Sequence, residues 1–512
     1  MAKMNIFNTV QFSKPKQSRF DLTHDVKLSF KMGQLTPTCC LEVIPGDKFD
    51  INVMNMLRML PLVSPVMHRI TVSTFFFFVP NRLLWSDWQE WITGNLDVEH
   101  PYATLDTTDE WAVSELADYL GYPVGNVAGP LRYNPFPFAA YALIWDEYFR
   151  DQNLQDKIFV PLVAGNNNTE YGPDQSLTQV VQHRAWQHDY FTSCLPFAQK
   201  GDDVLIPLTS EQNIPVEFVT GNNPLIVKPS DGVPIGTDGT VGTDGGQMWH
   251  QETNQNAALD PNGSLVVDVQ SDAVTINTLR RAFRLQEFLE RSARGGTRYI
   301  ESILSHFGVR SSDARLQRPE FIGAVRQKMV ISEVLATAQD VDNDQPIGQM
   351  NGHGISVGSG SLRYRAEEHG WLIGLINVQP DTAYQDGLHR SFTRFDRLDY
   401  AWPTFANLGE QAVLNKEIYA AHSEPDGVFG YNPQYSELRF ANSRVSGEMR
   451  ENLDFWQMGR KFSTSPALNE EFIKAVPTTR IFAVETGDHI VAHIVNGIQA
   501  TRKLPRFGIP TI

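Results

Sequence analysis

The hydrophobic pattern of residues 70–79 predicts a β-strand around which the rest of the chain is organised. Alternate positions of 70–78 share one face of this strand, and alternate positions of 71–79 share the other. The strand begins with one apolar face and ends with two, because Phe75–Phe78 are four consecutive phenylalanines. A half-solvated antiparallel strand keeps alternating, so we expect this end to be covered on both sides. Left uncovered it would promote aggregation, which implies a large β core, a partner subunit or both.

Other strand-like runs are scattered along the chain. They lie at Val26–Met32, Lys48–Met54, Gln327–Ser332, Gly370–Val378, Thr479–Val484 and Asp488–Ile498. Loops rich in Gly, Pro and Asp separate the later runs, and we interpret the stretch from Gly352 to Gly360 as one of these loops. Such an arrangement is typical of a β-sandwich or jelly roll with long inserted loops.

Helical patterns are confined to short segments. Apolar periodicity predicts helices at Trp111–Leu120, Phe138–Arg150, 278–293 and Tyr299–Phe307. In 278–293 the arginines surround the face opposite the apolar one. A further aromatic set recurs at spacing three, as on one side of a helical or 3₁₀ turn: Trp85, Trp88 and Trp91.

The composition is that of a folded protein. A chain of 512 residues suggests about two to four structural units, or one core with large insertions. Its 41% hydrophobic and 20% charged content excludes bulk disorder. We find no transmembrane run and no signal peptide, so we expect a protein made in a cytoplasm. Its three cysteines exclude a disulfide framework and give no zinc-site pattern: Cys39, Cys40 and Cys194.

Charge is distributed unevenly around a net value of −16. Residues 201–275 hold eleven acids and one base, whereas 280–328 hold eleven bases and five acids. Residues 1–31 hold six bases and two acids. The acidic stretch and the basic segments are expected to meet different neighbours. Residues 1–20 fit either an arm that reaches a subunit or nucleic acid, or an ordinary solvated tail.

No motif indicates catalysis or a bound metal. The nucleophile elbow, the phosphate-binding loop and the dinucleotide glycine fingerprint are all missing from the sequence. His183 and His188 have the wrong spacing for a helical metal pair. Cys194 lies in an apolar segment, where a free cysteine usually behaves as a small hydrophobe. The Asp-Gly repeat at 236–246 lacks the ligand order of a calcium loop and is interpreted as exposed turns. We therefore expect no enzyme, cofactor or metal site.

Five phrases along the chain are long enough to be specific. They are TFFFFVPNRLLWSDWQEW (74–91), HDYFTSCLPFAQKG (188–201), ARGGTRYIESILSHFGVRSSDARLQRPEFIG (293–323), FGYNPQYSELRF (429–440) and IVNGIQATRKLPRFGIPTI (494–512). In this order they resemble the major capsid protein of the microviruses, which are small single-stranded DNA bacteriophages. The gokushovirus-like branch is the nearest, and the resemblance covers nearly the whole chain.

The resemblance implies a viral jelly roll, an eight-stranded antiparallel β-barrel with long inserted loops and a few short helices. On this basis the chain divides into an N-terminal arm (1–20), a first jelly-roll part (21–200), a surface insertion (201–275), an Arg-rich helical segment (276–325) and a second jelly-roll part with the tail (326–512). The insertion is placed like the protrusion at the threefold axes.

The resemblance also implies a function and partners. The expected protein is a structural subunit that assembles with itself into a T=1 icosahedral shell around a circular single-stranded DNA genome. The insertion would contact a host receptor of unknown identity. Other expected partners are minor virion proteins such as a DNA pilot protein and a small DNA-binding protein. The expected location is the virion, assembled in the cytoplasm of the bacterial host.

Three sets of residues are candidates for these contacts. Aromatic and Arg-rich segments suit buried subunit interfaces, and the candidates are Phe75, Phe76, Phe77, Phe78, Trp85, Trp88, Trp91, Arg291 and Arg294. Basic residues near both ends suit phosphate contacts, unless both ends pack on neighbouring subunits: Lys14, Lys16, Arg19, Arg502, Lys503 and Arg506. Candidates for host contact in the insertion are Asp238, Thr240, Asp244 and Trp249.

Two alternatives from other classes were weighed. A secreted β-sandwich protein that binds or cleaves carbohydrate would line a sugar groove with its aromatics. The missing signal peptide and cysteine pairs count against it. A DNA-processing enzyme would need metal-ligand histidines or a catalytic tyrosine motif, which we do not find. We therefore prefer the hypothesis of a structural protein to both alternatives.

Overall fold

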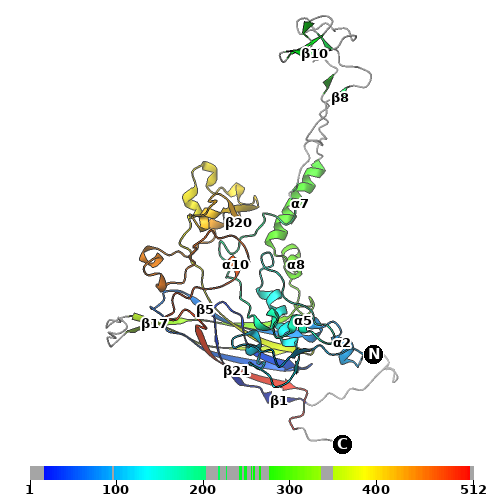
Figure 1. Cartoon of the computed structure of the whole chain (residues 1–512), viewed down its shortest axis with the longest axis vertical. Helices are drawn as coiled ribbons and strands as arrows, with labels where there is room; N and C mark the ends of the chain where they lie inside the picture. Colours follow the sequence, from blue (N-terminus) through cyan, green and yellow to red (C-terminus); the bar gives the residue numbers. More distant parts are fainter. Residues whose placement is uncertain are drawn as a thin grey trace, which may run out of the picture. The chain divides into compact units, whose positions relative to one another are not determined.

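The computed structural model describes residues 17–94, 97–202, 204, 276–335 and 350–507, with short strands between 217 and 266. Figure 1 traces these elements in chain order. The chain divides into two compact units. The first comprises Met1–Lys200 with Glu290–Ile512, and the second comprises Gly201–Leu289.

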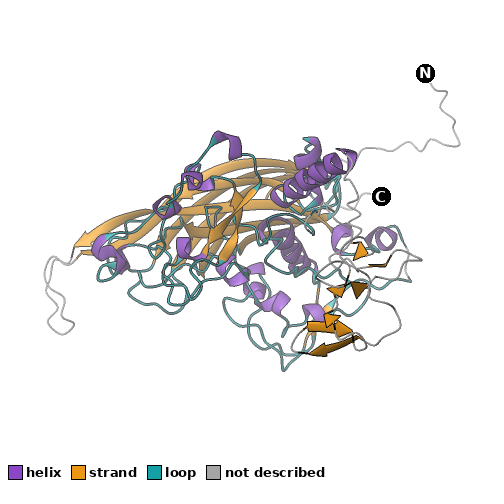
Figure 2. Cartoon of the chain, turned by 90° about the horizontal axis from the view of Figure 1, so that it is seen from above, coloured by secondary structure: helices purple, strands orange, loops and turns teal. Residues whose placement is uncertain are grey.

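Two antiparallel sheets form the centre of the first unit, and Figure 2 shows their long strands running side by side. The first sheet has the order β1 (Ser18–Asp21), β21 (Ile490–Arg502), β4 (Lys48–Met59), β17 (Met350–Arg365) and β16 (Val330–Leu335), and β2 (His24–Phe30) also pairs with β21. The second sheet has the order β15 (Glu320–Lys328), β5 (Ile70–Pro80), β18 (Gly370–Pro380) and β3 (Thr36–Val43).

The connectivity is that of a jelly roll. Along the chain β2 lies in the first sheet, β3 in the second, β4 in the first, and β5 and β15 in the second. β17, β18 and β21 then alternate between first, second and first. This alternation brings eight strands into two facing layers, four in each, and β1 and β16 extend the first sheet to six strands. The expected mainly β jelly-roll fold is confirmed.

Alternation of buried and exposed side chains explains why the two sheets face each other. Along β4 nearly every second residue is buried, beginning with Phe49 and Ile51. β21 follows the same rule with Ile490, Ile494 and Ile498. These side chains share one hydrophobic core with residues of the second sheet. A strand that buries one face and presents the other alternates in this way.

The phenylalanine strand β5 is covered on both faces, as its sequence predicts. Phe76 and Phe78 lie in the core between the sheets. Phe75 and Phe77 lie in a second core on the opposite face of the second sheet. Helix α4 (Phe136–Ile144), from the long insertion between β5 and β15, is part of this second core. The covering of both faces therefore comes from within the chain.

Besides β5, four predicted strands are confirmed, whereas one predicted strand and one predicted loop are wrong. The confirmed runs correspond to β2, β4, β18 and β21, and Gln327–Ser332 spans the junction of β15 and β16. Residues 479–484 form turns with an isolated bridge at Phe482 instead of a strand. Residues 352–360 belong to β17 and are not a loop. β3 was missed, because Pro37 interrupts its pattern. β3 is an edge strand, where a missing backbone donor is tolerated.

The glycines of β17 have a packing reason. A Cβ atom at Gly358 or Gly360 would overlap Gln327 and Val325 of β15, a strand of the second sheet. Glycine lets the two sheets approach closely at these positions, as strand glycines often do. Composition alone suggests a loop here, whereas tertiary packing selects a strand.

The helices are short, as expected, but their bounds differ from the predictions. α4 continues into the single π-helical turn η1 (Trp145–Phe149), and α8 (Tyr299–Phe307) agrees with its prediction. Of Trp111–Leu120 only Leu116–Leu120 is helical (α3), and Trp111 is buried before it. The remaining α-helices of the first unit are α1 (Asn81–Leu84), α2 (Trp88–Ile92), α5 (Asn168–Tyr171), α6 (Ser176–Gln179), α9 (Asn415–Ile418) and α10 (Glu470–Ile473).

A third core supports the insertion between β18 and β21, residues 381–489. It contains β19 (Glu410–Leu414) and β20 (Val428–Pro433), which pair with each other, and short 3₁₀ turns surround them. Phe191 and Cys194, from the insertion between β5 and β15, complete this core. A two-stranded sheet β6 (Ala103–Leu105) with β7 (Leu131–Tyr133) lies in that same earlier insertion.

The second unit contains short paired strands. β10 (Val241–Asp244), β11 (Gln247–His250) and β12 (Gln255–Asn256) form one sheet. β8 (Glu217–Phe218) pairs with β14 (Leu265–Val266), and β9 (Ile226–Val227) with β13 (Ala258–Leu259). The helix α7 (Ile276–Arg294) begins in this unit and ends in the first. Among the described residues, no helix combines the length and apolar character needed to span a membrane.

Candidate assembly and nucleic-acid surfaces

Cys194, the one nucleophile that the sequence suggests, is a buried core residue. Its Sγ donates a hydrogen bond to the backbone oxygen of Tyr190 over 3.3 Å. Burial raises the pKa of the Cys194 thiol well above its ordinary value. The thiol is therefore protonated at neutral pH and is not a nucleophile.

The two histidines of that region do not combine into a site. His183 Nδ1 lies 2.7 Å from the backbone oxygen of Ala475, and burial lowers the pKa of this imidazole. His188 is exposed. Within the described ranges, no group of three His, Cys, Asp or Glu side chains is arranged to hold a metal ion.

The phenylalanine candidates for a subunit interface lie inside the subunit. Phe75–Phe78 are at most 5% exposed in the isolated chain, so little of their surface is left for a neighbour. The same holds for Trp85, which is fully buried. This corrects the interface role of these five residues, because the insertion between β5 and β15 already covers the aromatic face, which is one of the two coverings that the sequence left open.

The tryptophans form an aromatic cluster that joins the end of β5 to the following insertion. The Trp85 and Trp91 ring centroids are 6.1 Å apart, and those of Trp88 and Trp91 are 5.6 Å apart. The rings also contact His100 and Phe136. Trp88 and Trp91 are half-buried, so only part of each ring is open to a neighbour.

Of the two arginine candidates for the interface, Arg294 has internal partners. Its guanidinium pairs with the buried carboxylate of Glu410 and donates to the backbone oxygen of Ser193. It therefore ties the end of α7 to β19. Arg291 is exposed on the last turns of the same helix.

An exposed apolar surface lies in the insertion between β18 and β21, and sequence analysis did not single it out. We call it the apolar insertion surface; it consists of Phe392, Phe395, Leu398, Tyr400, Trp402 and Leu408. Phe395 is 90% exposed and Leu408 is 68% exposed. An isolated soluble chain seldom exposes so many large apolar side chains within one short segment. The signal was present in the run FTRFDRLDYAWPTFANL, where an aromatic recurs every few residues.

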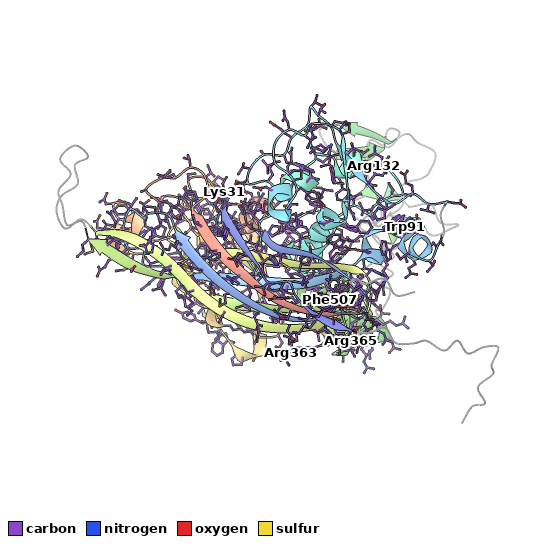
Figure 3. The ribbon with its side chains drawn as sticks, turned by 90° about the horizontal axis from the view of Figure 1, so that it is seen from below. Lys31, Trp91, Arg132, Arg363, Arg365 and Phe507 are labelled. Atoms are coloured by element: carbon purple, nitrogen blue, oxygen red, sulfur yellow. The ribbon has the colours of Figure 1, made fainter. Side chains whose placement is uncertain are left out.

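Four basic residues meet at one end of the first sheet. Strand register places Arg19 of β1 beside Thr501 of β21, then Lys48 of β4, then Arg365 of β17. Arg363, two residues before Arg365, lies one step along the same face. We call Arg19, Lys48, Arg363 and Arg365 the basic row. Figure 3 shows Arg363 and Arg365 near Phe507 at this end of the sheet.

The basic row is open to solvent. The Arg363 side chain is 89% exposed and that of Arg19 is 62% exposed. Both approach the same carboxylate, Asp50, at 3.1 and 3.7 Å respectively. Such exposed pairs are weak and leave most of the positive charge available to a phosphate backbone.

The other candidates for nucleic-acid contact differ in their exposure. Lys503 and Arg506 are exposed just beyond β21. Arg502 instead points inward: its Nε lies 3.1 Å from buried Asp47, and its Nη2 donates to the Glu42 backbone oxygen over 2.7 Å. Arg502 thus has structural partners within the chain, and its contact with DNA stays a prediction. Lys14 and Lys16 lie outside the described residues.

The host-contact candidates lie in the second unit. Asp244 ends β10 opposite Gln247 of β11, and Trp249 of β11 stands opposite Gly242. Both therefore belong to one antiparallel hairpin. Asp238 and Thr240 lie outside the described residues.

Comparison with known proteins finds capsid proteins that are similar over nearly the whole chain. The family model described as "Capsid protein (F protein)" matches residues 8–512. The chain is 33% identical to "Capsid protein VP1" of Chlamydia phage 1 over 99% of this chain and 97% of the relative. It is 35% identical to "Capsid protein VP1" of Bdellovibrio phage phiMH2K, covering 96% of this chain and 95% of the relative.

A third relative extends the same pattern. The chain is 30% identical to "Capsid protein VP1" of Spiroplasma virus 4, over 92% of this chain and 90% of the relative. These three relatives come from gokushoviruses. The chain therefore belongs to the capsid protein (F protein) family of the microviruses and is a structural protein of the virion, not an enzyme.

Proposed function

We propose that copies of this chain close into a T=1 icosahedral shell around a circular single-stranded DNA genome. The observation that carries the proposal is the apolar insertion surface. A second copy that covers it would remove Phe395 and Leu408 from water, and apolar burial is the main favourable contribution to most protein association. A jelly-roll subunit with several heterologous surfaces can close into rings and shells.

The basic row supports contact with the enclosed DNA. Each cation that neutralises a phosphate releases a counterion, so a cluster of cations binds a nucleic-acid backbone without reading its sequence. Lys503 and Arg506 add charge at the same end of the sheet. Phe507 is 71% exposed beside them and offers an aromatic ring on which an unpaired base can stack.

The second unit is proposed to face the host. It contains the acidic stretch 201–275, and the hairpin of β10 and β11 includes Asp244 and Trp249. Companion proteins of the virion, such as a DNA pilot protein and a small DNA-binding protein, complete the proposal. Assembly is proposed to take place in the cytoplasm of the bacterial host.

The test compares two substitutions at Phe395. Phe395→Ser removes the ring from an exposed position, so the subunit should fold but form few particles. Phe395→Leu keeps an apolar side chain and should restore a large part of the particle yield. Particle yield is measured by sedimentation of cell extracts, and folding by thermal unfolding of the unassembled subunit. Equal particle yields from wild type and Phe395→Ser would overturn the role of this surface.

A further inference from the structure

A cavity of about 710 Å³ lies on the face of β5 that is turned away from the first sheet, at the point where this face changes from aromatic to polar side chains. Thr71 and Ser73 line it, whereas Phe75 and Phe77 of the same face belong to the second core. Its other walls come mainly from residues 148–154, 184–188, 192–196 and 293–298. All these residues belong to the first unit.

Five arginines and two carboxylates line this cavity. Three of the arginines have carboxylate partners: Arg150 with Asp146 at 3.7 Å, Arg298 with Glu301 at 3.3 Å, and Arg294 with Glu410. The remaining lining carboxylate, Asp151, accepts the backbone N–H groups of Asn153 and Leu154. The lining carboxylates are thus already engaged in structural contacts.

The two lining arginines without a carboxylate partner are Arg184 and Arg326. Neither side chain forms an ion pair or a hydrogen bond with any residue in the part of the chain that the structure describes. Burial, and then the like charge of Arg326, lowers the pKa of Arg184 from its ordinary value. Two cations that repel each other at one cavity, Arg184 half-buried and Arg326 exposed, favour an anion bound between them.

The backbone holds both arginines in place. The Arg184 N–H donates to the Gly33 backbone oxygen over 3.0 Å, and the Arg184 backbone oxygen accepts the Ala475 N–H over 2.9 Å. The Arg184 guanidinium carbon lies 5.6 Å from the Phe75 ring centroid. Arg326 stands directly opposite Ser73 in the register of β15 and β5. An anion would therefore meet two guanidinium groups that extend from fixed backbone positions.

We propose that this cavity, which we call the arginine pocket, receives an acidic side chain from a second copy of the chain. This inference rests on the proposed self-assembly. Guanidinium groups bind carboxylates in a planar, two-pronged geometry. The chain has 59 acidic and 43 basic residues, so a neighbouring copy offers mainly carboxylates. The pocket and the basic row lie on opposite outer faces of the two-sheet sandwich, so DNA bound at the row does not reach the pocket.

The experiment uses Arg184→Gln, Arg326→Gln and the double variant, with Lys328→Gln as the matched control. Lys328 is an exposed cation two residues beyond Arg326 on β15 and does not line the cavity. The unassembled double variant should melt at or above the wild-type temperature, because an internal repulsion is removed. Its particle yield should fall at least tenfold, whereas Lys328→Gln should assemble like wild type. Arg184→Lys, which keeps the charge, should restore part of the yield.

A density map of wild-type particles identifies the occupant directly. The expected map shows an Asp or Glu of an adjacent copy within hydrogen-bonding distance of Arg184 and Arg326. A nucleic-acid phosphate, or only solvent, in the pocket would overturn the proposal. So would a double variant that assembles like Lys328→Gln, or one whose subunit melts below wild type, because the arginines would then be structural. Failure of the wild-type chain to form particles would instead overturn the proposed function.

Discussion

At the scale of single residues, exposed and buried phenylalanines are expected to separate folding from assembly. Phe75→Ala and Phe76→Ala should each destabilise the unassembled subunit by about 3–5 kcal/mol, because each ring fills a core on its own side of β5. Phe395→Ala should change that stability by less than about 0.5 kcal/mol, because the ring is exposed. Chemical denaturation of the unassembled subunit measures all three. A stable Phe75→Ala variant would contradict the covering of both faces.

His183 makes the stability of the subunit depend on pH. Burial, and then the nearby charges of Lys474 and Lys31, lowers the pKa of His183 below its ordinary value of 6.5. The unfolded chain therefore takes up a proton before the folded chain does, so stability is complete above pH 6.5 and falls as the pH decreases below it.

The expected result is a melting temperature that decreases between pH 7 and the lowered pKa of His183. His183→Gln should reduce this pH dependence, although half-buried His68, whose pKa burial also lowers, should preserve part of it. Thermal unfolding at a series of pH values is the measurement. An unchanged pH profile in His183→Gln would contradict this assignment.

The cysteines should be unreactive in the folded chain. Cys39 and Cys194 are buried, and burial raises the pKa of Cys40 to about 12. A thiol reagent at neutral pH should label none of them before unfolding and all three afterwards, measured by absorbance. Rapid native labelling of Cys194 would reopen the question of a reactive thiol.

At the scale of elements, the glycines of β17 are expected to control how closely the sheets approach. Gly360→Val should destabilise the subunit by about 1–3 kcal/mol, because a side chain would overlap Val325 of β15. Ser359→Val, on the exposed face of the same strand, is the control and should be close to neutral. Chemical denaturation of both variants checks the difference. Equal stability of the two variants would contradict the packing reason given for these glycines.

The basic row is an element-scale feature because four strands contribute to it or align it. The variant Arg19→Gln/Lys48→Gln/Arg365→Gln should assemble but retain less DNA, since three phosphate contacts are lost. The ratio of absorbance at 260 and 280 nm, measured on purified particles, reports DNA content. Lys157→Gln, an exposed cation in the insertion between β5 and β15, is the control for loss of charge. Unchanged DNA content in the triple variant would rule out the row as a DNA contact.

Local patterns explain which parts of the fold the sequence predicts. Alternation identifies β4 and β21, and the four phenylalanines of β5 indicate covering on both faces. β17 escapes this reasoning, because its glycines are selected by contact with β15 and carry no apolar signal. The jelly-roll assignment came from the family resemblance, since alternation alone does not order the strands.

The surfaces are harder to predict than the strands. Arg19, Lys48 and Arg365 are distant in sequence and become neighbours only through strand register. Arg184 and Arg326 likewise meet only across the cavity. Conversely, the aromatic residues from Phe75 to Trp85 suggest an interface by composition but are buried by the chain's own insertion. Composition shows that a segment is apolar. Only the folded structure shows whether the same chain or a neighbouring molecule covers that segment.

At the scale of the whole molecule, the jelly roll covers its aromatic strand by itself and leaves the apolar insertion surface exposed. Sedimentation velocity of the purified chain over a range of concentrations, with electron micrographs of the fastest fraction, tests this most directly. We predict closed particles of uniform size, lost in Phe395→Ser and retained in Phe395→Leu. A stable monomer at every concentration, or wild-type particles matched by Phe395→Ser, would contradict the account.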